Sequence, residues 1–311
     1  MEEQLVRQGR KEICKIQYSG RNNEKMMYFT FDSLTDTEIV EHFFSTRQGG
    51  VSKAPFDTLN FSYSRGDEKE AVDENFRRAA AVFHREASDI VCSVQTHTTN
   101  IRKVTPADKG KGVTRPRDYE DVDGLITNEA GIILATFYAD CVPLFVVDTV
   151  HRAIGLSHSG WRGTVARMGR ATLEAMAREY GTRPEDVRVV IAPSICQDCY
   201  EVSGDVALAF SDTFARDDDK AAEYLRRYKD TITEREIAEC LLYQKNAAQK
   251  ADGKYQLNLW YANFRVFRDA GVPDENIEIT DVCTCCNAKL LFSHRASNGQ
   301  RGNLGAFLML A

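Results

Sequence analysis

Short apolar runs on either side of a cysteine, and ahead of a histidine, limit what this chain can fold into, and they occur together within residues 132–162. Each run is rich in Ile, Val or Phe and is too short for a buried helix, so it predicts a buried strand. The runs are residues 132–137, 142–147 and 153–156. Cys141 precedes the second run, and His158 follows the third, just before a turn with Gly160. We expect the thiol and the imidazole to meet at adjacent strand ends, and we interpret that point as the candidate active site.

The composition is that of a soluble globular protein, with 43% hydrophobic and 28% charged residues. No run of about 18 apolar residues occurs, so no membrane helix is expected. The N-terminal segment carries both charge signs and lacks the apolar stretch of a secretory signal, which favours a cytoplasmic location. The net charge of -6 argues against nucleic acid as a partner, because proteins that bind phosphate backbones gather Lys and Arg on one face.

The rest of the chain mixes short strands with amphipathic helices. Strands are expected at residues 12–18, 27–31, 39–44, 89–94, 121–126, 186–192, 277–282, 290–293 and 305–309, the first three as a meander. Helices are expected at residues 68–86, 164–180 and 256–270. Residues 203–254 are helical in pattern but strongly charged, which predicts a peripheral segment packed on the sheet. Neither a repeat nor a linker divides the chain, so residues 1–311 are predicted to form a single domain.

Three residues fit the ligand count of a catalytic zinc site, which takes three protein ligands and keeps a fourth position for water or substrate. They are His97, Cys141 and His158, each at a strand end that leads into a polar turn. Asp121 and Asp123 could orient a metal-bound imidazole, although a simple Asp-Gly turn explains them equally well. The same residues could form a covalent cysteine hydrolase, with Cys141 as the nucleophile and a histidine as the base. The residue pattern leaves both mechanisms open.

Other residues offer weaker signals. Cys196 and Cys199 form a CxxC pair, and Cys283, Cys285 and Cys286 lie far downstream, so a four-thiolate zinc site is conceivable. The CxCC spacing of the second group instead favours redox or packing thiols, and an odd total of nine cysteines favours a reduced state.

Polar loop residues could face a ligand or simply decorate the surface. Arg47 and Asn60, with Ser62 nearby, lie on predicted loops. Arg162 stands at the start of the helix after Gly160, where unpaired N–H groups make a plausible seat for phosphate. The Gly and Lys spacing of a P-loop is absent from this segment.

Several motifs occur in the order found in the YfiH family, also called the laccase-domain family, which includes FAMIN and the peptidoglycan editing factors. They are Arg47-Gln48-Gly49-Gly50-Val51-Ser52, Leu59-Asn60, Gln95-Thr96-His97, Asp123-Gly124-Leu125, Ala139-Asp140-Cys141-Val142-Pro143, His158-Ser159-Gly160-Trp161-Arg162-Gly163, Cys199-Tyr200-Glu201-Val202 and Ser293-His294-Arg295. The chain resembles this family from about residue 40 to its C-terminus. It departs from the pattern at Ala192-Pro193-Ser194, where Gly-Pro is common, and in an enlarged charged segment at residues 215–252.

The resemblance implies a single α+β layered sandwich with a mixed sheet core, related to the Cys/His toxin deamidase fold. It also implies zinc at the family's His, Cys, His positions, here His97, Cys141 and His158. Family members cleave adenosine, inosine and methylthioadenosine with phosphate and deaminate adenosine with water. If this chain shares these family properties, its partners are purine nucleosides and phosphate, and it is a monomer or a small homo-oligomer.

The resemblance also suggests roles for further residues. Arg47, Arg162 and the helix start after Gly160 would hold phosphate, Asn60 would touch the nucleoside, and Asp140 would orient a ligand. Copper is a weaker expectation than zinc, because six histidines without a His-x-His pair cannot fill a multicopper site. An amide hydrolase acting on cell-wall peptide precursors through Cys141 is the alternative enzyme. A zinc-stabilised interaction module is the third hypothesis.

Overall fold

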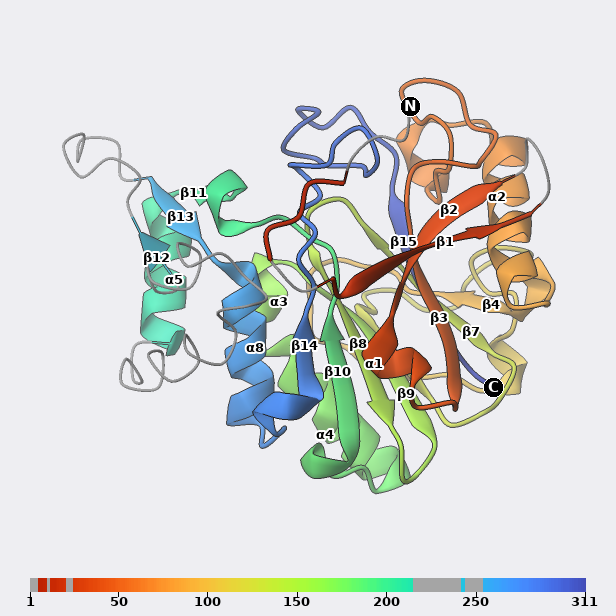
Figure 1. Ribbon diagram of the computed structural model, residues 1–311. Helices are drawn as coiled ribbons and strands as arrows, with labels where there is room; N and C mark the ends of the chain where they lie inside the picture. The colour runs from red at the N-terminus through yellow and green to blue at the C-terminus, as the bar shows by residue number, and fades with distance from the viewer. Residues whose placement is uncertain (1–4, 10–11, 21–24, 215–241, 244–253) are drawn as a thin grey trace.

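The computed structural model describes residues 5–9, 12–20, 25–214, 242–243 and 254–311. Two six-stranded sheets lie face to face at its centre, with helices on their outer faces (Figure 1). Strands and helices are mixed along the chain, and each sheet contains parallel and antiparallel pairs. The predicted α+β fold with a mixed sheet core is therefore confirmed.

The first sheet begins with the expected meander of three N-terminal strands, which pair antiparallel. Its strands in spatial order are β1 (Cys14–Ser19), β2 (Met26–Phe31), β3 (Val40–Ser45), β15 (Leu304–Leu310), β7 (Ile133–Tyr138) and β4 (Ile90–Cys92). The C-terminal strand β15 is inserted between β3 and β7, so the two ends of the chain share one sheet. The β4–β7 pair is parallel.

The second sheet contains the strands that flank the candidate active site. Its strands in spatial order are β14 (Ile277–Ile279), β10 (Val187–Ile191), β8 (Val142–Asp148), β9 (Ala153–Ser159), β6 (Gly124–Thr127) and β5 (Ile101–Lys103). The hairpin of β8 and β9 pairs Pro143 with His158, so Cys141 lies just beyond the paired residues. A small third sheet consists of β11 (Glu201–Val202), β13 (Tyr255–Leu257) and β12 (Leu242–Tyr243).

Strand β8 shows why these runs are apolar throughout. Leu144 and Val146 pack toward the helices on the outer face, whereas Phe145 and Val147 pack toward the first sheet. Both faces of a strand must be apolar when both are covered, and each such side chain contributes roughly 1.5–3 kcal/mol on burial. The continuous apolar pattern therefore places β8 at the centre of the molecule.

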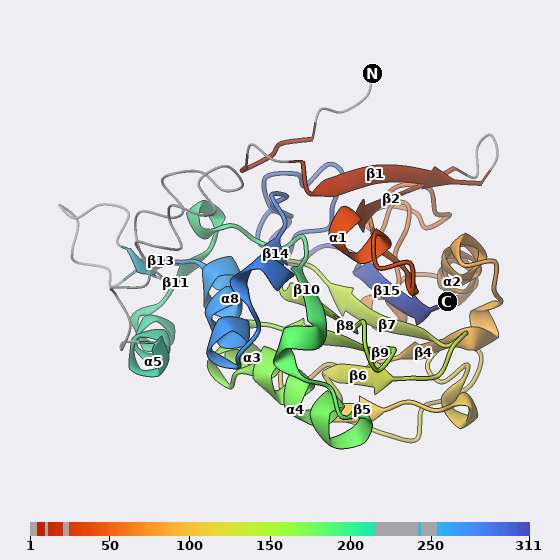
Figure 2. The same ribbon diagram turned by 60° about the horizontal axis from the view of Figure 1, so that its bottom comes forward.

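The helices cover the two outer faces, as the rotated view shows (Figure 2). α2 (Lys69–Val82) packs on the first sheet, and α4 (Met168–Tyr180) and α8 (Leu259–Asp269) pack on the second. The shorter helices are α1 (Asp32–Thr35), α3 (Trp161–Val165) and α5 (Gly204–Phe214). Among the described residues, no helix is long and apolar enough to cross a bilayer.

Several expectations differ from the structure. The helix expected at residues 164–180 is two helices, because Arg167 adopts a left-handed conformation with φ of 61° between α3 and α4. Residues 290–293 form a turn and bend rather than a strand. Of the predicted peripheral helical segment, α5 is present, residues 242–243 form strand β12 rather than helix, and residues 215–241 and 244–253 lie outside the described residues. The helix expected at residues 256–270 begins only at Leu259, because residues 255–257 form strand β13.

Candidate functional site

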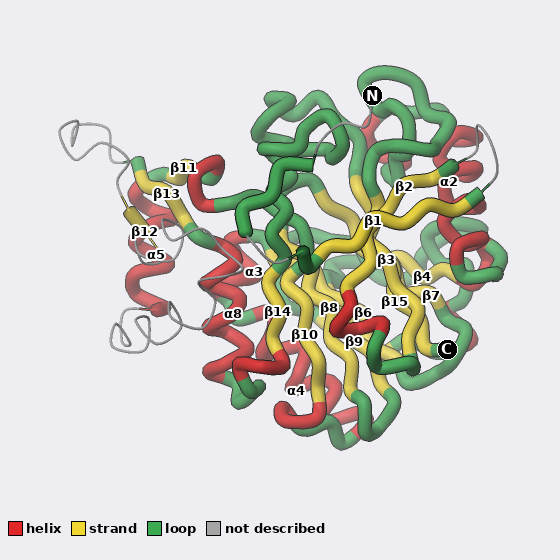
Figure 3. The backbone as a smooth tube through the Cα atoms, in the orientation of Figure 1, coloured by secondary structure: helices red, strands yellow, loops and turns green. Residues whose placement is uncertain are grey.

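The three candidate ligands lie together where loops leave the strand ends. Figure 3 shows how loops gather at the ends of the sheets. Cys141 occupies the turn between β7 and β8, His158 lies near the end of β9, and His97 follows β4. Their ligand atoms all lie within 4.8 Å of one another, and His97 Nε2 is 4.0 Å from Cys141 Sγ. The structure thus brings together the three side chains that sequence reasoning singled out.

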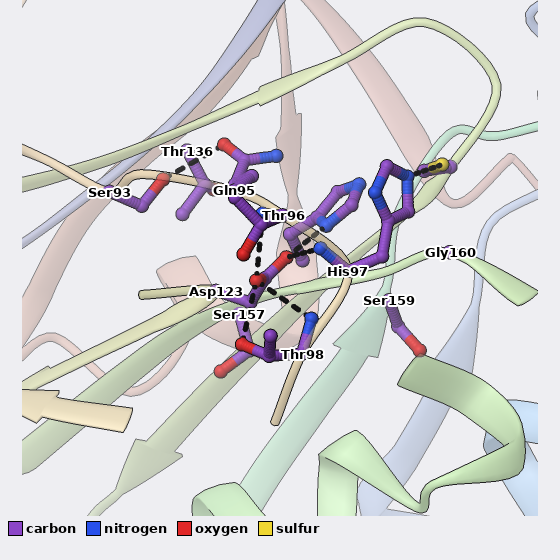
Figure 4. Close-up of polar contacts among 12 residues, drawn as sticks. Ser93, Gln95, Thr96, His97, Thr98, Asp123, Thr136, Ser157, Ser159 and Gly160 are labelled. Carbon is purple, nitrogen blue, oxygen red and sulfur yellow. Dashed lines mark hydrogen bonds and ion pairs between the residues drawn. The ribbon is translucent and has the colours of Figure 1, made fainter. Parts of the chain in front are cut away.

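Asp123 hydrogen-bonds to both histidines, and the close-up shows it beside His97 and the turn of Thr96 and Thr98 (Figure 4). Its buried Oδ1 accepts hydrogen bonds from His158 Nδ1 at 2.8 Å and from the His97 backbone N–H at 3.0 Å. Its Oδ2 accepts from the backbone N–H groups of Thr96 and Thr98 at 3.0 and 2.9 Å, and from the Thr98 hydroxyl. These bonds hold His97 in a left-handed conformation with φ of 66°.

One carboxylate therefore orients the imidazole, as expected for a ligand histidine. Because Asp123 occupies Nδ1 of His158, Nε2 is the nitrogen left to face Cys141 and His97. Asp121, the other candidate, is exposed, and its carbonyl rather than its carboxylate accepts bonds from Thr98 and Asn100.

The electrostatics of the site favour a thiolate next to an imidazolium. Burial alone would raise the pKa of Cys141, but the charges and hydrogen bonds of His158 and His97 outweigh it and lower the pKa to about 6. Burial would likewise lower the pKa of His158, but Cys141 and Asp123 raise it to about 9. Burial would raise the pKa of Asp123, yet the bonds from His158, Thr96 and Thr98 lower it to about 2.

Gly160 makes the close approach of these groups possible. A Cβ atom at this position would lie 2.7 Å from His97 Cδ2 and 3.1 Å from Cys141 Sγ. Since real Cβ atoms do not tolerate a contact as short as the first, any other residue would push the imidazole away. The glycine that precedes α3 is therefore part of the site's geometry.

The donor set fits a zinc ion. Two imidazole nitrogens and one thiolate are typical zinc ligands, and bonds of about 2.0–2.3 Å place tetrahedral ligand atoms about 3.3–3.8 Å apart. The observed separations, all within 4.8 Å, require only small side-chain movements to reach this spacing. A site with three protein ligands leaves one position for water or substrate.

A pocket with a volume of about 320 Å³ opens beside the three ligands. Aromatic rings form part of its wall, namely Phe61, Tyr63, Phe76, Phe137 and Tyr138. Three arginines, Arg65, Arg117 and Arg301, also line it. Sequence reasoning missed these arginines because they come from loops far apart in the chain and belong to no short spacing pattern.

Arg301 lies beside a second arginine in this wall. Burial and the neighbouring charge of Arg65 together lower the pKa of Arg301 to about 10, although the negative charges of Asp140 and Cys141 oppose this shift. Its Nε is buried without a hydrogen-bond partner, while its Nη1 donates to the Gly302 carbonyl and the Asn303 side chain. Within the described part of the chain, neither Arg65 nor Arg301 forms an ion pair with a carboxylate, so the pair suits an anionic ligand.

The two arginines expected to hold phosphate lie elsewhere. Arg47 donates to the carbonyls of Asp57 and Ala288 and pairs with the Asp57 carboxylate at 3.1 Å, so its guanidinium braces a loop. Arg162 is exposed and stacks over Trp161. Neither belongs to the pocket wall. Motif membership could not show which arginine side chains turn toward the ligands.

Asn60 and Asp140 position loops around the pocket. Asn60 is fully buried and bonds to Ser62, Asp67 and Asn303, thereby shaping the loop that carries Arg65. The carboxylate of Asp140 accepts from the Thr284 hydroxyl and the Arg295 backbone N–H, both at 2.7 Å. Asp140 adopts φ of 91° next to Cys141, so these bonds set the position of the thiol.

Comparison with known proteins gives consistent matches over most of the chain. The family model described as multi-copper polyphenol oxidoreductase laccase matches residues 41–311. The purine nucleoside phosphorylase YlmD of Bacillus subtilis (strain 168) is 33% identical over 269 residues, which cover 85% of this chain and 86% of that protein. Adenosine deaminase RL5, from an unknown prokaryotic organism, is 29% identical over 265 residues, covering 85% and 91% of the two chains. The crystal structure of YlmD from Geobacillus stearothermophilus has a TM-score of 0.80 and 29% identity, covering 96% and 99%.

Proposed function

Because the chain belongs to the multi-copper polyphenol oxidoreductase laccase family, also known as the YfiH family, we propose that it is a purine nucleoside phosphorylase that also deaminates adenosine. Adenosine, inosine and methylthioadenosine are its proposed substrates, with phosphate or water as the second reactant. One observation carries this proposal: a single pocket is lined both by His97, Cys141 and His158 and by two arginines, Arg65 and Arg301, that form no ion pair with a described carboxylate. Such a pocket can hold a nucleoside beside an anion.

Zinc is the proposed cofactor, with His97, Cys141 and His158 as its ligands. Bound there, zinc would supply a Lewis acid and lower the pKa of a coordinated water toward about 7. A set of one thiolate and two imidazoles does not suit a multicopper oxidase, which needs many more histidines than the six in this chain. The proposed chemistry is therefore transfer and hydrolysis rather than oxidation.

We assign the phosphate to Arg65 and Arg301 in place of the Arg47 and Arg162 expected from the motifs. Phosphate oxygens accept well from guanidinium groups, and an anion would relieve the repulsion between the two arginines. In the reaction a phosphate oxygen bonds to the anomeric carbon as the bond to the purine nitrogen breaks. The products are the free base and the 1-phosphate of the substrate's sugar, which is ribose 1-phosphate from adenosine or inosine, and the two arginines align the attacking group.

The base and the ribose occupy the rest of the pocket in this proposal. The rings of Tyr63 and Phe137 give flat apolar surfaces on which a purine can pack. Asn60 contributes indirectly by holding the loop that carries Arg65, and Asp140 by holding Cys141. In deamination, water replaces the amino group of adenosine, and ammonia leaves.

A cysteine amide hydrolase is the second candidate, because one observation favours it. Cys141 has a lowered pKa, lies beside His158, and is backed by Asp123 through the same histidine. This order of thiol, imidazole and carboxylate is that of a cysteine nucleophile with its base. In that mechanism Cys141 would bond to substrate, whereas in the phosphorylase it would serve as a zinc ligand.

Product analysis separates the two functions. Purified protein given adenosine and phosphate is expected to yield adenine and ribose 1-phosphate, and adenosine alone is expected to yield inosine. Iodoacetamide should inactivate a hydrolase at once by alkylating Cys141, but should act on the phosphorylase only after zinc is removed. No product from adenosine, inosine or methylthioadenosine, together with immediate alkylation, would reject the phosphorylase in favour of the hydrolase.

A further inference from the structure

Four cysteines from two distant segments converge outside the pocket. Cys196 and Cys199 follow β10, and Cys283 and Cys286 follow β14. Their four sulfur atoms all lie within 4.8 Å of one another. The Cys199–Cys286 and Cys196–Cys286 sulfur separations are 3.5 and 3.9 Å. All four are free thiols.

We propose that these four cysteines bind a structural zinc ion. A zinc–sulfur bond of about 2.3 Å places the sulfurs of a tetrahedral site about 3.8 Å apart. The two measured separations lie on either side of this value. Four protein ligands fill the coordination sphere and leave no position for substrate, which distinguishes a structural site from a catalytic one.

Hydrogen-bond donors around the sulfurs fit the negative charge of thiolates. The backbone N–H groups of Cys196 and Cys286 point at Cys283 Sγ, at 3.2 and 3.4 Å. Gln8 Nε2 donates to Cys286 Sγ at 3.3 Å. Donors of this kind orient thiolate ligands and disperse their charge. Packing thiols in an apolar core would have no need of three such partners.

The sequence spacing is compatible with this site once the ligands are identified. Cys283 and Cys286 are three residues apart, so they form a second CxxC pair in which Cys285 is one of the intervening residues. Cys285 is not one of the four converging thiols. The expectation of redox or packing thiols counted Cys285 as an equal member of the group, and this hid the regular pairing.

A zinc ion at this site would cross-link the two loops that contact the backbone next to Cys141. The segments already touch through a bridge between Ser194 and Cys283. Thr284, within the second pair, donates to the Asp140 carboxylate, and the N–H of Ile195, next to Cys196, donates to the Asp140 carbonyl at 3.1 Å. Asp140 precedes Cys141, so the four-cysteine ion would stabilise the backbone that presents the Cys141 thiol to the pocket, without itself contacting substrate.

Zinc analysis of variants tests this proposal apart from the proposed function. Cys141→Ser removes a ligand of the pocket site only, so the purified variant should keep about one zinc per chain. Adding Cys199→Ser should abolish this remaining zinc, whereas adding Cys285→Ser, the matched control, should leave it. Zinc retained by the Cys141→Ser, Cys199→Ser double variant would overturn the assignment.

X-ray absorption at the zinc edge covers the case in which the double variant fails to fold. Zinc in the Cys141→Ser protein should show four sulfur neighbours at about 2.3 Å and no nitrogen. A mixed nitrogen and sulfur shell, bound iron in place of zinc, or a disulfide between the two pairs would each overturn the proposal. None of these readouts depends on whether the protein cleaves nucleosides.

Discussion

Replacing Asp123 with Asn keeps the shape of the side chain and removes its charge, so it tests whether this carboxylate organises the site. The carboxylate accepts five hydrogen bonds, from His158, His97 and Thr96 and twice from Thr98. The Asn amide has one oxygen and one NH₂ group. Whichever position the NH₂ group takes, it faces at least two of the donors that the carboxylate accepted from. A hydrogen bond to a charged group contributes roughly 1.5–3 kcal/mol, and turn 96–98 is partly exposed. We therefore expect Asp123→Asn to lose about 3 kcal/mol of unfolding free energy.

Denaturant unfolding of metal-stripped protein measures this loss without a contribution from bound zinc. The affinity of the pocket for zinc, measured by competition with a chelator, should fall by about 10–100-fold, as for other residues that orient a ligand. Asp121→Asn is the matched control. Asp121 is exposed, and its left-handed φ of 51° is one that Asn tolerates. It contacts the turn only through its backbone carbonyl, which accepts a hydrogen bond from Thr98. If Asp123→Asn and Asp121→Asn unfold alike and bind zinc alike, the central role given to Asp123 is wrong.

Three further predictions concern the pocket. Gly160→Ala should fold but lose at least about tenfold in zinc affinity by chelator competition, because its Cβ displaces His97; an unchanged affinity would contradict the contact distances. Arg301→Gln should raise the KM for phosphate about tenfold or more, whereas Arg162→Gln, a change at an exposed residue, should leave it unchanged. The reverse result would return the phosphate to Arg162, as the motifs suggested. In metal-stripped protein, alkylation of Cys141 should rise with pH through about 6 and then level off, since only the thiolate reacts; a midpoint near the ordinary value of 9.0 would show that the histidines do not stabilise the thiolate.

The core of the fold could be predicted from the sequence because its strands are buried on both faces. The runs that form most of β7, β8 and β9 are predominantly apolar, and short runs of this kind are typical of strands covered on both sides. The break at Arg167 could not be predicted, because a left-handed residue between two helices leaves the helical spacing of apolar residues almost intact. The strand expected at residues 290–293 is wrong because a short apolar run does not show whether a neighbouring strand is available for pairing.

The sequence predicted those parts of the site that depend on residue type. It did not predict those that depend on which way a side chain points. His97, Cys141 and His158 stood out because few side chains bind zinc and each follows an apolar run. Asp121 and Asp123 have equal weight in the sequence. In the structure the buried Asp123 carboxylate accepts bonds from His158 and from the His97 turn, whereas Asp121 is exposed. Arginines are common on any surface, so nothing in the sequence distinguishes the inward-facing Arg301 from Arg47, which is bound to Asp57.

Zinc titration into metal-stripped protein, followed by phosphate-dependent release of adenine from adenosine, tests the central claim most directly. The stripped protein should be inactive, and its activity should rise with added zinc to a plateau at no more than about two ions per chain, one for the pocket and one for the four cysteines. Cys141→Ser should stay inactive throughout the titration. If the stripped protein or Cys141→Ser cleaves adenosine at the full wild-type rate, the His97, Cys141 and His158 cluster is not the active site.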